Sequence, residues 1–323
     1  MIEINSKKIE MWSKIGSRAT FGLSVLDIEK KIKNLCVLTC DVSTSAGLDR
    51  FRKQVPEKFL ELGISEQNLI GMASGLSSEG FEVITTTFAP FQTMRCCEQI
   101  KVNLGYMNTK VIMAGLASGL VLGSLGYTHC SVEDVGVLRS IPNITIISPA
   151  DGLEVVKTLV ASLNYDKSVY IRLTGGANIT PVYVKDYKFE IGKAVKLKEG
   201  NDITIIACGA AVGQSLKAAE ILKDKNIDAA VVNMHTIKPI DKDIIIEEAN
   251  SKKIIVTVEE HNIIGGLGSA VAEVLSSVNS SSKLLTIGIN DKYSKSGSYE
   301  FLLKYYGLTA DKIVETITKN FIK

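Results

Sequence analysis

The sequence has 323 residues, of which 46% are hydrophobic and 22% charged, and this composition excludes a disordered tail or a fibrous repeat. The net charge is +2 without any basic block, so no nucleic-acid-binding surface is predicted. A chain of this length usually forms about two domains.

Short apolar runs alternate with helical patterns along the chain. Runs bounded by turn residues predict buried strands at 35–40, 82–86, 110–114, 144–148, 169–173, 203–208, 229–233 and 254–258. Apolar residues spaced along one face predict helices at 18–33, 67–78, 151–163, 209–225, 241–250 and 267–278. This alternation gives the fold class α/β: two doubly wound domains with mostly parallel sheets, covered by helices on both faces. A polar, lysine-rich segment divides them, and we predict domains at 1–185 and 190–323.

Neither a targeting segment nor a membrane span is expected. The charged start, MIEINSKKIEM, lacks the apolar core of a secretory signal. Residues 111–132 are uncharged and long enough to cross a bilayer, but glycines and polar residues break the second half. A buried strand that continues into a glycine-rich loop is favoured. The six cysteines form no C-x-x-C pair, which indicates reduced thiols, a cytoplasmic protein and no zinc site.

Nucleotide-binding motifs are incomplete in this sequence. Gly266-Leu267-Gly268 is the nearest match to a dinucleotide fingerprint, but Val271 stands where a third small residue belongs. A Walker P-loop is absent from the sequence. These glycines therefore indicate tight packing between helix and strand rather than a dinucleotide site.

Glu66 is the first candidate for chemistry. It follows a strand and a glycine turn in FLELGISEQNLIGMASGL, at a predicted helix start. Acidic residues are common there because the helix dipole favours negative charge, so capping is one interpretation. The apolar neighbours indicate burial, and a buried carboxyl has a raised pKa and can exchange a proton near neutral pH. Glu66 is therefore also a candidate acid–base group.

Two aromatic residues and a histidine are the next candidates. Phe88 and Phe91 bracket a proline after a strand, where such residues either belong to the core or clamp a flat heteroaromatic ring. His129 ends the uncharged, glycine-rich segment, so few other polar groups compete with it there. A surface or capping role is its alternative.

Several motifs in a fixed order resemble transketolase. They are GISEQN, TTFAPF followed by Arg95 and Glu98-Gln99, TH with LRSIPN and SPAD, VNMHTIKPID and EEHNIIGGLGSAVAEVL. The resemblance covers nearly the whole chain from Arg18 onward and is greatest to the separate C-terminal subunit of split transketolases. It implies a pyrimidine-binding domain, a transketolase C-terminal domain, and thiamine-diphosphate-dependent transfer of a two-carbon ketol unit from a ketose to an aldehyde.

The resemblance also implies roles for individual residues. Glu66 matches the glutamate that hydrogen-bonds the aminopyrimidine of the cofactor, and His129 matches a histidine that faces the substrate; both are expected to be catalytic. The expected cofactor-binding residues are Asp41, Ile64, Glu66, Phe88 and Phe91. The expected substrate-binding residues are Arg18, Ser43, His129 and Arg172. His261 matches a family position that we expect to be structural.

One family motif is missing. The other domain of transketolases holds the diphosphate through Mg²⁺ with a Gly-Asp-Gly motif, and no Gly-Asp-Gly occurs in this sequence. Oxygen ligands for Mg²⁺ should therefore come mainly from a partner, the N-terminal transketolase subunit. We expect a dimer of heterodimers, with a small-residue face of Gly71, Ala73, Ser74 and Gly75 at the interface.

Two departures from the family concern the substrate. Leu125 stands where many transketolases have an acid before the histidine, and Gly175 stands near the place of a phosphate-binding arginine. Met94 lies near a position that is aromatic in many relatives. The change at Met94 implies a looser clamp on the pyrimidine ring. The changes at Leu125 and Gly175 predict an unusual sugar, such as one from a surface-polysaccharide or secondary pathway, instead of an ordinary pentose phosphate.

Other interpretations stay open at this point. The β-subunit of a 2-oxo acid dehydrogenase shares the architecture and predicts a lipoyl-bearing partner. Deoxyxylulose-phosphate synthase is similar but is one long chain with its own Gly-Asp-Gly. A non-catalytic assembly partner is a third interpretation, against which the retained Glu66 argues.

Overall fold

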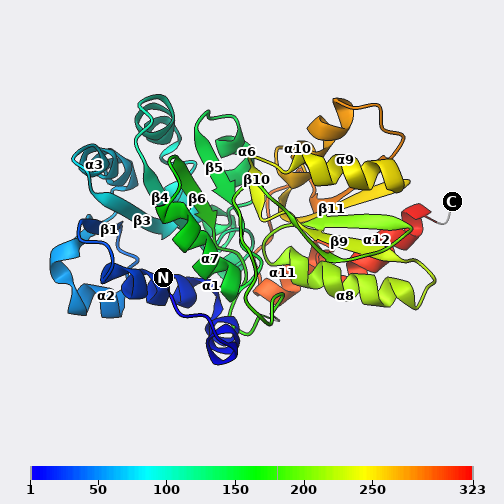
Figure 1. Cartoon of the computed structure of the whole chain (residues 1–323), viewed down its shortest axis with the longest axis horizontal. Helices are drawn as coiled ribbons and strands as arrows, with labels where there is room; N and C mark the ends of the chain where they lie inside the picture. Colours follow the sequence, from blue (N-terminus) through cyan, green and yellow to red (C-terminus); the bar gives the residue numbers. More distant parts are fainter. Residues whose placement is uncertain (1, 180, 322–323) are drawn as a thin grey trace.

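The computed structural model describes residues 2–179 and 181–321, which form two α/β domains side by side (Figure 1). The first sheet has seven strands in the order β10-β5-β6-β4-β3-β1-β2, and the second has five in the order β12-β11-β8-β9-β7. Neighbouring strands are parallel except for the pairs β10–β5 and β7–β9. The strands are β1 (Leu35–Thr39), β2 (Phe59–Glu61), β3 (Glu82–Phe88), β4 (Val111–Leu116), β5 (Ile144–Ile147), β6 (Ser168–Arg172), β7 (Val195–Lys198), β8 (Ile203–Ala207), β9 (Ala229–Asn233), β10 (Thr236–Lys238), β11 (Ile254–Asn262) and β12 (Lys283–Ile289). The predicted fold class is confirmed.

Helices cover both faces of each sheet. The helices are α1 (Ser6–Glu29), α2 (Asp49–Gln54), α3 (Glu66–Ser78), α4 (Ala89–Gln92), α5 (Cys97–Gln99), α6 (Asp134–Arg139), α7 (Gly152–Leu163), α8 (Ala211–Lys223), α9 (Lys242–Ser251), α10 (Leu267–Ser276), α11 (Tyr299–Tyr305) and α12 (Ala310–Phe321). Helices α1 and α7 pack on one face of the first sheet, and α3, α6 and the π-helical turn at Ile100–Tyr106 pack on the other. Helices α8 and α12 cover one face of the second sheet, and α9 and α10 cover the other.

The continuous apolar runs arise because the strands are buried on both faces. In β1, for example, Cys36 and Leu38 join the core beneath α3, whereas Leu35 and Val37 join the core beneath α1. Successive side chains of a strand point to opposite faces, so a strand covered on both sides needs apolar residues at every position. This is why the eight predicted strands are found, with shifts at their ends.

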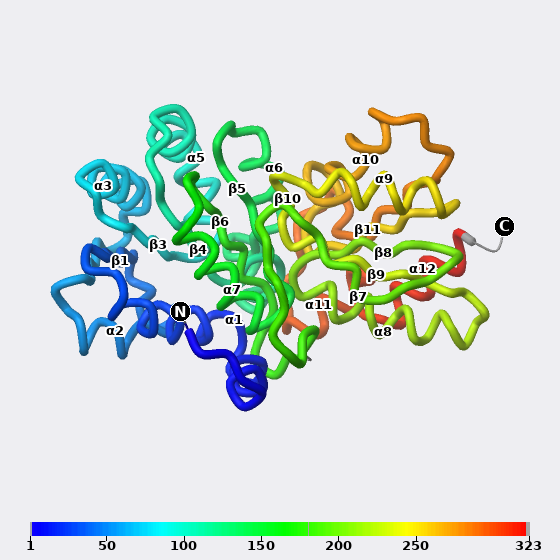
Figure 2. The backbone as a smooth tube through the Cα atoms, in the orientation of Figure 1, coloured from blue at the N-terminus to red at the C-terminus, as the bar shows by residue number. Residues whose placement is uncertain are grey.

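The second domain contributes one strand to the first sheet. Strand β10 follows β9 directly and pairs with β5, as the tube between the two halves of the molecule shows (Figure 2). Between β6 and β7 the described residues form turns and bends without a helix or strand. The boundary at 185–190 lies in this segment and stays a prediction.

The uncharged segment 111–132 is strand β4 followed by a loop, as predicted. Among residues 2–179 and 181–321, none of the helices combines the length and the apolar character that crossing a membrane requires.

His235, just before β10, leads to a prediction about pH and stability. Its imidazole is fully buried, stacks on Phe189 with ring centroids 4.3 Å apart, and has Nδ1 2.9 Å from Thr236 Oγ1. Burial lowers the pKa of His235 from 6.5 to about 4. The unfolded chain therefore takes up a proton below about pH 6.5 that the folded chain refuses, so stability is lost as pH falls through this window. The expected loss between pH 7 and pH 4 is about 3 kcal/mol.

Chemical unfolding of the wild type and of His235→Phe, which keeps a ring against Phe189, measures this effect. The difference between the two free energies of unfolding should change with pH between 6.5 and 4 and stay constant above pH 7. Parallel pH curves for the two proteins would show that His235 is not the titrating group.

Candidate active site

Most of the expected site residues lie where the carboxyl ends of the strands meet, on one side of the first sheet. Strands β1, β2, β3 and β4 are parallel neighbours, so their carboxyl ends meet at this edge. Asp41 and Ser43 follow β1, Glu66 follows β2, Phe88 ends β3, and the segment with His129 follows β4. Ligands of open α/β sheets bind at the carboxyl ends of the strands, so this edge is the candidate active site.

Glu66 lies at the start of α3, after the turn at Gly63, whose φ is +64°. Its side chain is 3% exposed, which confirms the burial expected from the sequence. The carboxylate accepts a hydrogen bond from Arg95 Nη1 at 2.7 Å, and the Arg95 side chain is 40% exposed. Glu66 is thus buried within the chain, but its ionic partner reaches it from the solvent side.

Two thiols flank Glu66. Burial raises the pKa of Cys40 to about 11, and burial together with the Glu66 charge raises the pKa of Cys96 to about 12. Both therefore stay protonated near neutral pH and are poor nucleophiles. Cys96 Sγ donates a hydrogen bond to the Phe91 carbonyl. All six cysteines are free thiols, as the sequence predicts.

Three half-buried rings form a cluster that Arg95 connects to this acid. The ring centroids of Phe88 and Phe91 are 6.4 Å apart, and His129 lies 6.3 Å from Phe88 and 5.3 Å from Phe91, all in edge-to-face arrangements. The guanidinium of Arg95 lies 4.0 Å from the Phe91 ring centre. Arg95 therefore links Glu66 to the aromatic cluster, a role that the sequence did not reveal although its motif contains the residue.

Asp41, Ser43 and Ile64 lie on the turns around this cluster. The Asp41 and Gly63 amides both donate to Glu61 Oε1, at 2.7 and 3.0 Å, so Glu61 joins the turn after β1 to the turn after β2. Asp41 has a φ of +56° and is exposed. Ile64 is 76% exposed, which is a large exposure for an apolar side chain. Ser43, in contrast, is buried.

The two arginines that were expected to bind substrate differ in their burial and in their partners. Arg18, on α1, is half-buried, and desolvation lowers its pKa. Arg172 is 1% exposed: its Nε bonds Asp134, and its Nη2 bonds the carbonyls of Ser131 and Glu260. The expectation for Arg172 is therefore corrected, because the side chain is buried and its Nε and Nη2 donate to groups of both domains.

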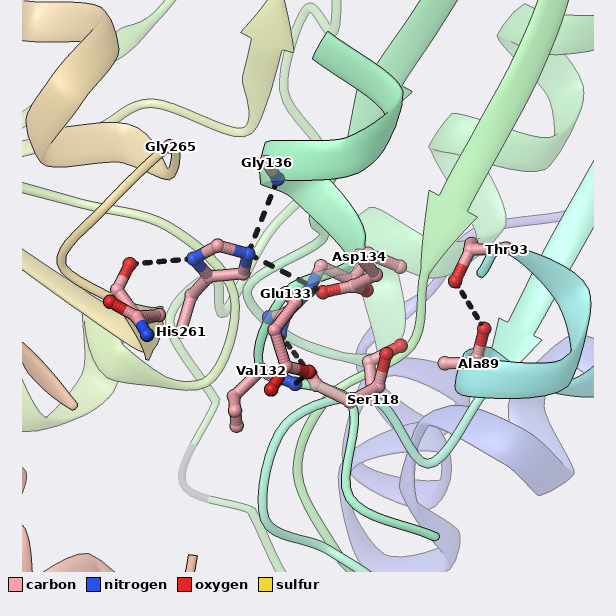
Figure 3. A network of polar contacts seen from close by, with 12 residues as sticks. Ala89, Thr93, Ser118, Val132, Glu133, Asp134, Gly136, His261 and Gly265 are labelled. Atoms are coloured by element: carbon pink, nitrogen blue, oxygen red, sulfur yellow. Dashed lines mark hydrogen bonds and ion pairs between the residues drawn. The ribbon is translucent and has the colours of Figure 1, made fainter. Parts of the chain in front are cut away.

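His261 is buried where the two domains meet, beside Gly136 and Asp134 (Figure 3). Its Nδ1 lies 2.7 Å from the Asn262 carbonyl, and its Nε2 accepts the Gly136 amide at 3.3 Å. This pair of bonds requires the neutral tautomer with the proton on Nδ1. The geometry agrees with a structural role, as expected from the sequence.

The remaining residues singled out in the sequence are divided between surface and core. Leu125 is 57% exposed and Met94 is 38% exposed, whereas Gly175 is buried with a φ of +78°. The proposed small-residue face of α3 is corrected. Ala73 and Ser74 pack inside their own domain, and only Gly71 and Gly75 of this set are exposed, with open space above them.

Comparison with known families identifies the family of the chain. Residues 13–177 match the family described as "Transketolase, pyrimidine binding domain", and residues 192–313 match "Transketolase, C-terminal domain". The chain belongs to the transketolase family. It corresponds to the C-terminal section of a split transketolase.

Individual relatives are similar to this chain along almost their whole length. A proposed transketolase C-terminal section of Methanocaldococcus jannaschii is 40% identical over 95% of this chain and 97% of its own. A subunit of the apulose-4-phosphate transketolase of Phocaeicola vulgatus is 36% identical over 96% of this chain and 98% of its own. A subunit of the 6-deoxy-6-sulfo-D-fructose transketolase of Clostridium sp. (strain MSTE9) is 35% identical over 94% and 95%.

Solved structures agree with this assignment. A split-gene transketolase, described as an inactive beta4 tetramer, superposes with a TM-score of 0.87 at 36% identity, covering 94% of this chain and 98% of that one. The transketolase of Campylobacter jejuni superposes with a TM-score of 0.78 at 20% identity, covering 98% of this chain and 49% of that one, and this likeness shows the fold alone.

Proposed function

We propose that this chain is the cofactor-activating subunit of a two-chain transketolase, which transfers a two-carbon ketol unit from a ketose to an aldehyde in the cytoplasm. The observation that carries the proposal is the buried Glu66 carboxylate, which Arg95 joins to the cluster of Phe88, Phe91 and His129 at the carboxyl ends of the strands. Acid, aromatic faces and an imidazole form the donor set that an aminopyrimidine and a sugar require.

The residues present fit the pyrimidine half of thiamine diphosphate. This cofactor, when bound, supplies the carbanion chemistry that no side chain provides. In our proposal Glu66 holds a proton on a ring nitrogen, Phe88 and Phe91 pack on the ring, and Asp41 and Ile64 border it. His129 donates or accepts hydrogen bonds at the sugar oxygens, and Ser43 and Arg18 border the substrate channel. Arg95, now paired with Glu66, would have to shift to make room.

The metal half of the site should come from a partner chain. Within the described residues, no group of three or more His, Cys, Asp and Glu side chains is arranged to hold a metal ion. We therefore propose that Mg²⁺ and the diphosphate bind mainly to an N-terminal transketolase subunit, with the pyrimidine in the cleft between the chains. Relatives named as subunits of a transketolase support a partner chain, and we propose a dimer of heterodimers as the closed symmetric assembly.

The purified chain alone, given thiamine diphosphate and Mg²⁺, is expected to show no ketol transfer. Activity should appear when the partner subunit is added and should saturate at one partner per chain. Titration of the partner at fixed substrate measures both properties. Robust turnover by the chain alone would overturn the proposal that the site is shared.

We further propose that the substrate is an unusual sugar. Leu125 presents an apolar side chain close to His129 in sequence, so a donor hydroxyl that meets it in the assembled site finds no polar partner there. If the partner subunit covers this position, the unpaired hydroxyl costs about 1–3 kcal/mol. Two relatives are named for apulose 4-phosphate and 6-deoxy-6-sulfo-D-fructose. Both names support a substrate outside the common pentose phosphates.

A competition assay on the assembled enzyme tests the substrate. Deoxy, sulfonated or unphosphorylated ketoses should have a higher kcat/KM than xylulose 5-phosphate, and Leu125→Asp should shift the ratio towards xylulose 5-phosphate. If xylulose 5-phosphate with ribose 5-phosphate instead reaches the highest value, above about 10⁴ M⁻¹s⁻¹, the substrate proposal is wrong.

A further inference from the structure

The loop that carries His129 has a closed base. Gly119 and Ser131 form an isolated antiparallel bridge, with amide-to-carbonyl distances of 2.8 and 2.9 Å in the two directions. Between them lie two 3₁₀ turns, Gly123–Leu125 and Tyr127–His129. Residues 119–131, here called the His129 loop, therefore form one structural unit with both candidate specificity groups, Leu125 and His129, between its ends.

Glu260 of the second domain holds the base of the His129 loop. This carboxylate is 2% exposed; its Oε1 accepts the Leu120 amide at 2.7 Å, and its Oε2 accepts the Tyr299 hydroxyl at 2.7 Å. Gly119 has a φ of +76°, and a Cβ there would collide with the same carboxylate. Glycine is thus required at the point where Glu260 meets the loop, both for space and for backbone conformation.

The other end of the base is tied to the same residue through its main chain. Arg172 Nη2 donates to the Glu260 carbonyl at 2.8 Å and to the Ser131 carbonyl at 3.0 Å. Glu260 therefore holds both ends of the loop. Its carboxylate binds the Leu120 amide directly, and its carbonyl is joined to the Ser131 carbonyl through the Arg172 guanidinium. Charge-assisted bonds of this kind are stronger than neutral ones, particularly when buried.

The second domain also contacts the middle of the loop. The Gly297 amide donates to the Gly123 carbonyl at 3.0 Å, and a Cβ on Gly123 would collide with Leu302. Tyr293 meets Tyr127 edge-to-face with ring centroids 4.5 Å apart. The loop thus rests on the second domain along most of its length.

Packing around the loop is incomplete on the side of Val121. A cavity of about 410 Å³ lies between the domains, with Val121 of the loop, Glu260 and Tyr299 in its wall. On this side the position of the loop therefore depends more on its hydrogen bonds, including those of Glu260, than on close packing.

We propose that the second domain positions the His129 loop for catalysis, and that Glu260 is the positioning residue. The proposal rests on the proposed transketolase function, in which His129 meets the sugar. A misplacement of about 1 Å in a group that orients substrate lowers a rate by about 10²-fold, so a bond at the base of the loop has a measurable effect on turnover.

The neighbouring residue provides a matched control. Glu259 is also a buried carboxylate of β11 with two hydrogen bonds, to the amides of Leu267 at 2.6 Å and Gly268 at 2.8 Å. These partners belong to α10 of its own domain, so Glu259→Ala removes the same number of bonds without touching the loop. Glu260→Gln retains an acceptor for the Leu120 amide and serves as the conservative variant.

The test is a double-mutant cycle on the assembled two-chain enzyme. Glu260→Ala should lower kcat/KM about 10- to 100-fold, and Glu260→Gln should recover most of the loss. In a His129→Ala background the further loss from Glu260→Ala should fall below about 2-fold, whereas that from Glu259→Ala should be the same in both backgrounds. Equal, additive losses for Glu259→Ala and Glu260→Ala would show that Glu260 only stabilises the fold.

Amide exchange gives a second measurement that does not require turnover. Peptides covering residues 119–131 should exchange faster in Glu260→Ala than in Glu259→Ala, and unchanged exchange would overturn the proposal. Faster exchange in an assembly that transfers no ketol unit from any ketose would leave the positioning intact and refute the proposed function instead. If Glu260→Ala does not assemble, Tyr299→Phe removes one bond to Glu260 and enters the same cycle and exchange measurement.

Discussion

Glu66→Gln is expected to lower the turnover of the assembled enzyme by about 10²–10⁴-fold, the usual loss when a general acid–base group is removed. The side chain is 3% exposed, so a substitute of the same size is needed to keep the start of α3 in place. Glutamine has that size and still accepts a hydrogen bond from Arg95, but it has no carboxyl proton to hold on the cofactor ring. The loss should therefore appear in kcat, while binding of thiamine diphosphate falls much less.

Two measurements separate activation from binding. Exchange of the cofactor's C2 proton, followed with the partner present, should slow together with turnover, and calorimetric titration should give a similar cofactor affinity for both proteins. Glu98→Gln is a matched control, because Glu98 belongs to the same group of motifs but is exposed. Exchange at the wild-type rate in Glu66→Gln would refute the assignment.

The strands that the sequence predicted are those buried on both faces. Strands β1 and β4 read as unbroken apolar runs because every position is covered. Four strands are outside the eight predicted ranges, and all four lie at sheet edges: β2, β7, β10 and β12. Strands β2 and β10 have three residues and are too short for a pattern, although a strand was expected before Glu66. Strand β7 is half-buried along its length, and five of the seven residues of β12 are exposed or half-buried. Helix α1 begins at Ser6, whereas the sequence predicted a start at residue 18. Gly16, with a φ of +81°, kinks the helix, and the apolar spacing predicted only the part that follows this kink.

The site was predictable where motifs follow strands, and not where distant residues pair. Phe88 and Phe91 lie at or just after the end of β3, Glu66 follows the short strand β2, and His129 lies in the segment after β4, so parallel pairing places them at the same end of the sheet. Arg95 and Glu66 are 29 positions apart, and Glu260 lies 140 positions from Leu120, so neither contact leaves a local pattern. Arg172 was misassigned for the same reason: its partner Asp134 is 38 positions away, and without that partner an arginine at a strand end resembles a phosphate ligand.

Arg172→Met is expected to destabilise the protein by about 3–5 kcal/mol, because it leaves a charge buried without its partner. Asp134 is fully buried; its Oδ2 accepts from Arg172 Nε at 2.8 Å and from the Tyr170 hydroxyl at 2.7 Å. Methionine fills a similar volume but leaves Asp134 without the guanidinium, with the Tyr170 hydroxyl as a donor and His261 Nε2 3.8 Å away. It also removes the donors to the carbonyls of Ser131 and Glu260, so the contact between the domains weakens as well.

A second substitution distinguishes the unpaired charge from the lost volume. In Arg172→Met with Asp134→Asn, the amide oxygen still accepts from Tyr170 and no charge remains, so a large part of the lost stability should return. Lys14→Met, which breaks an exposed ion pair with Glu10 at 2.7 Å, should leave the free energy of unfolding nearly unchanged. Guanidinium unfolding of the four proteins measures all of these effects. If Arg172→Met were no more destabilising than Lys14→Met, Arg172 would not be the internal link between the domains, and its expected contact with a phosphorylated substrate would have to be considered again.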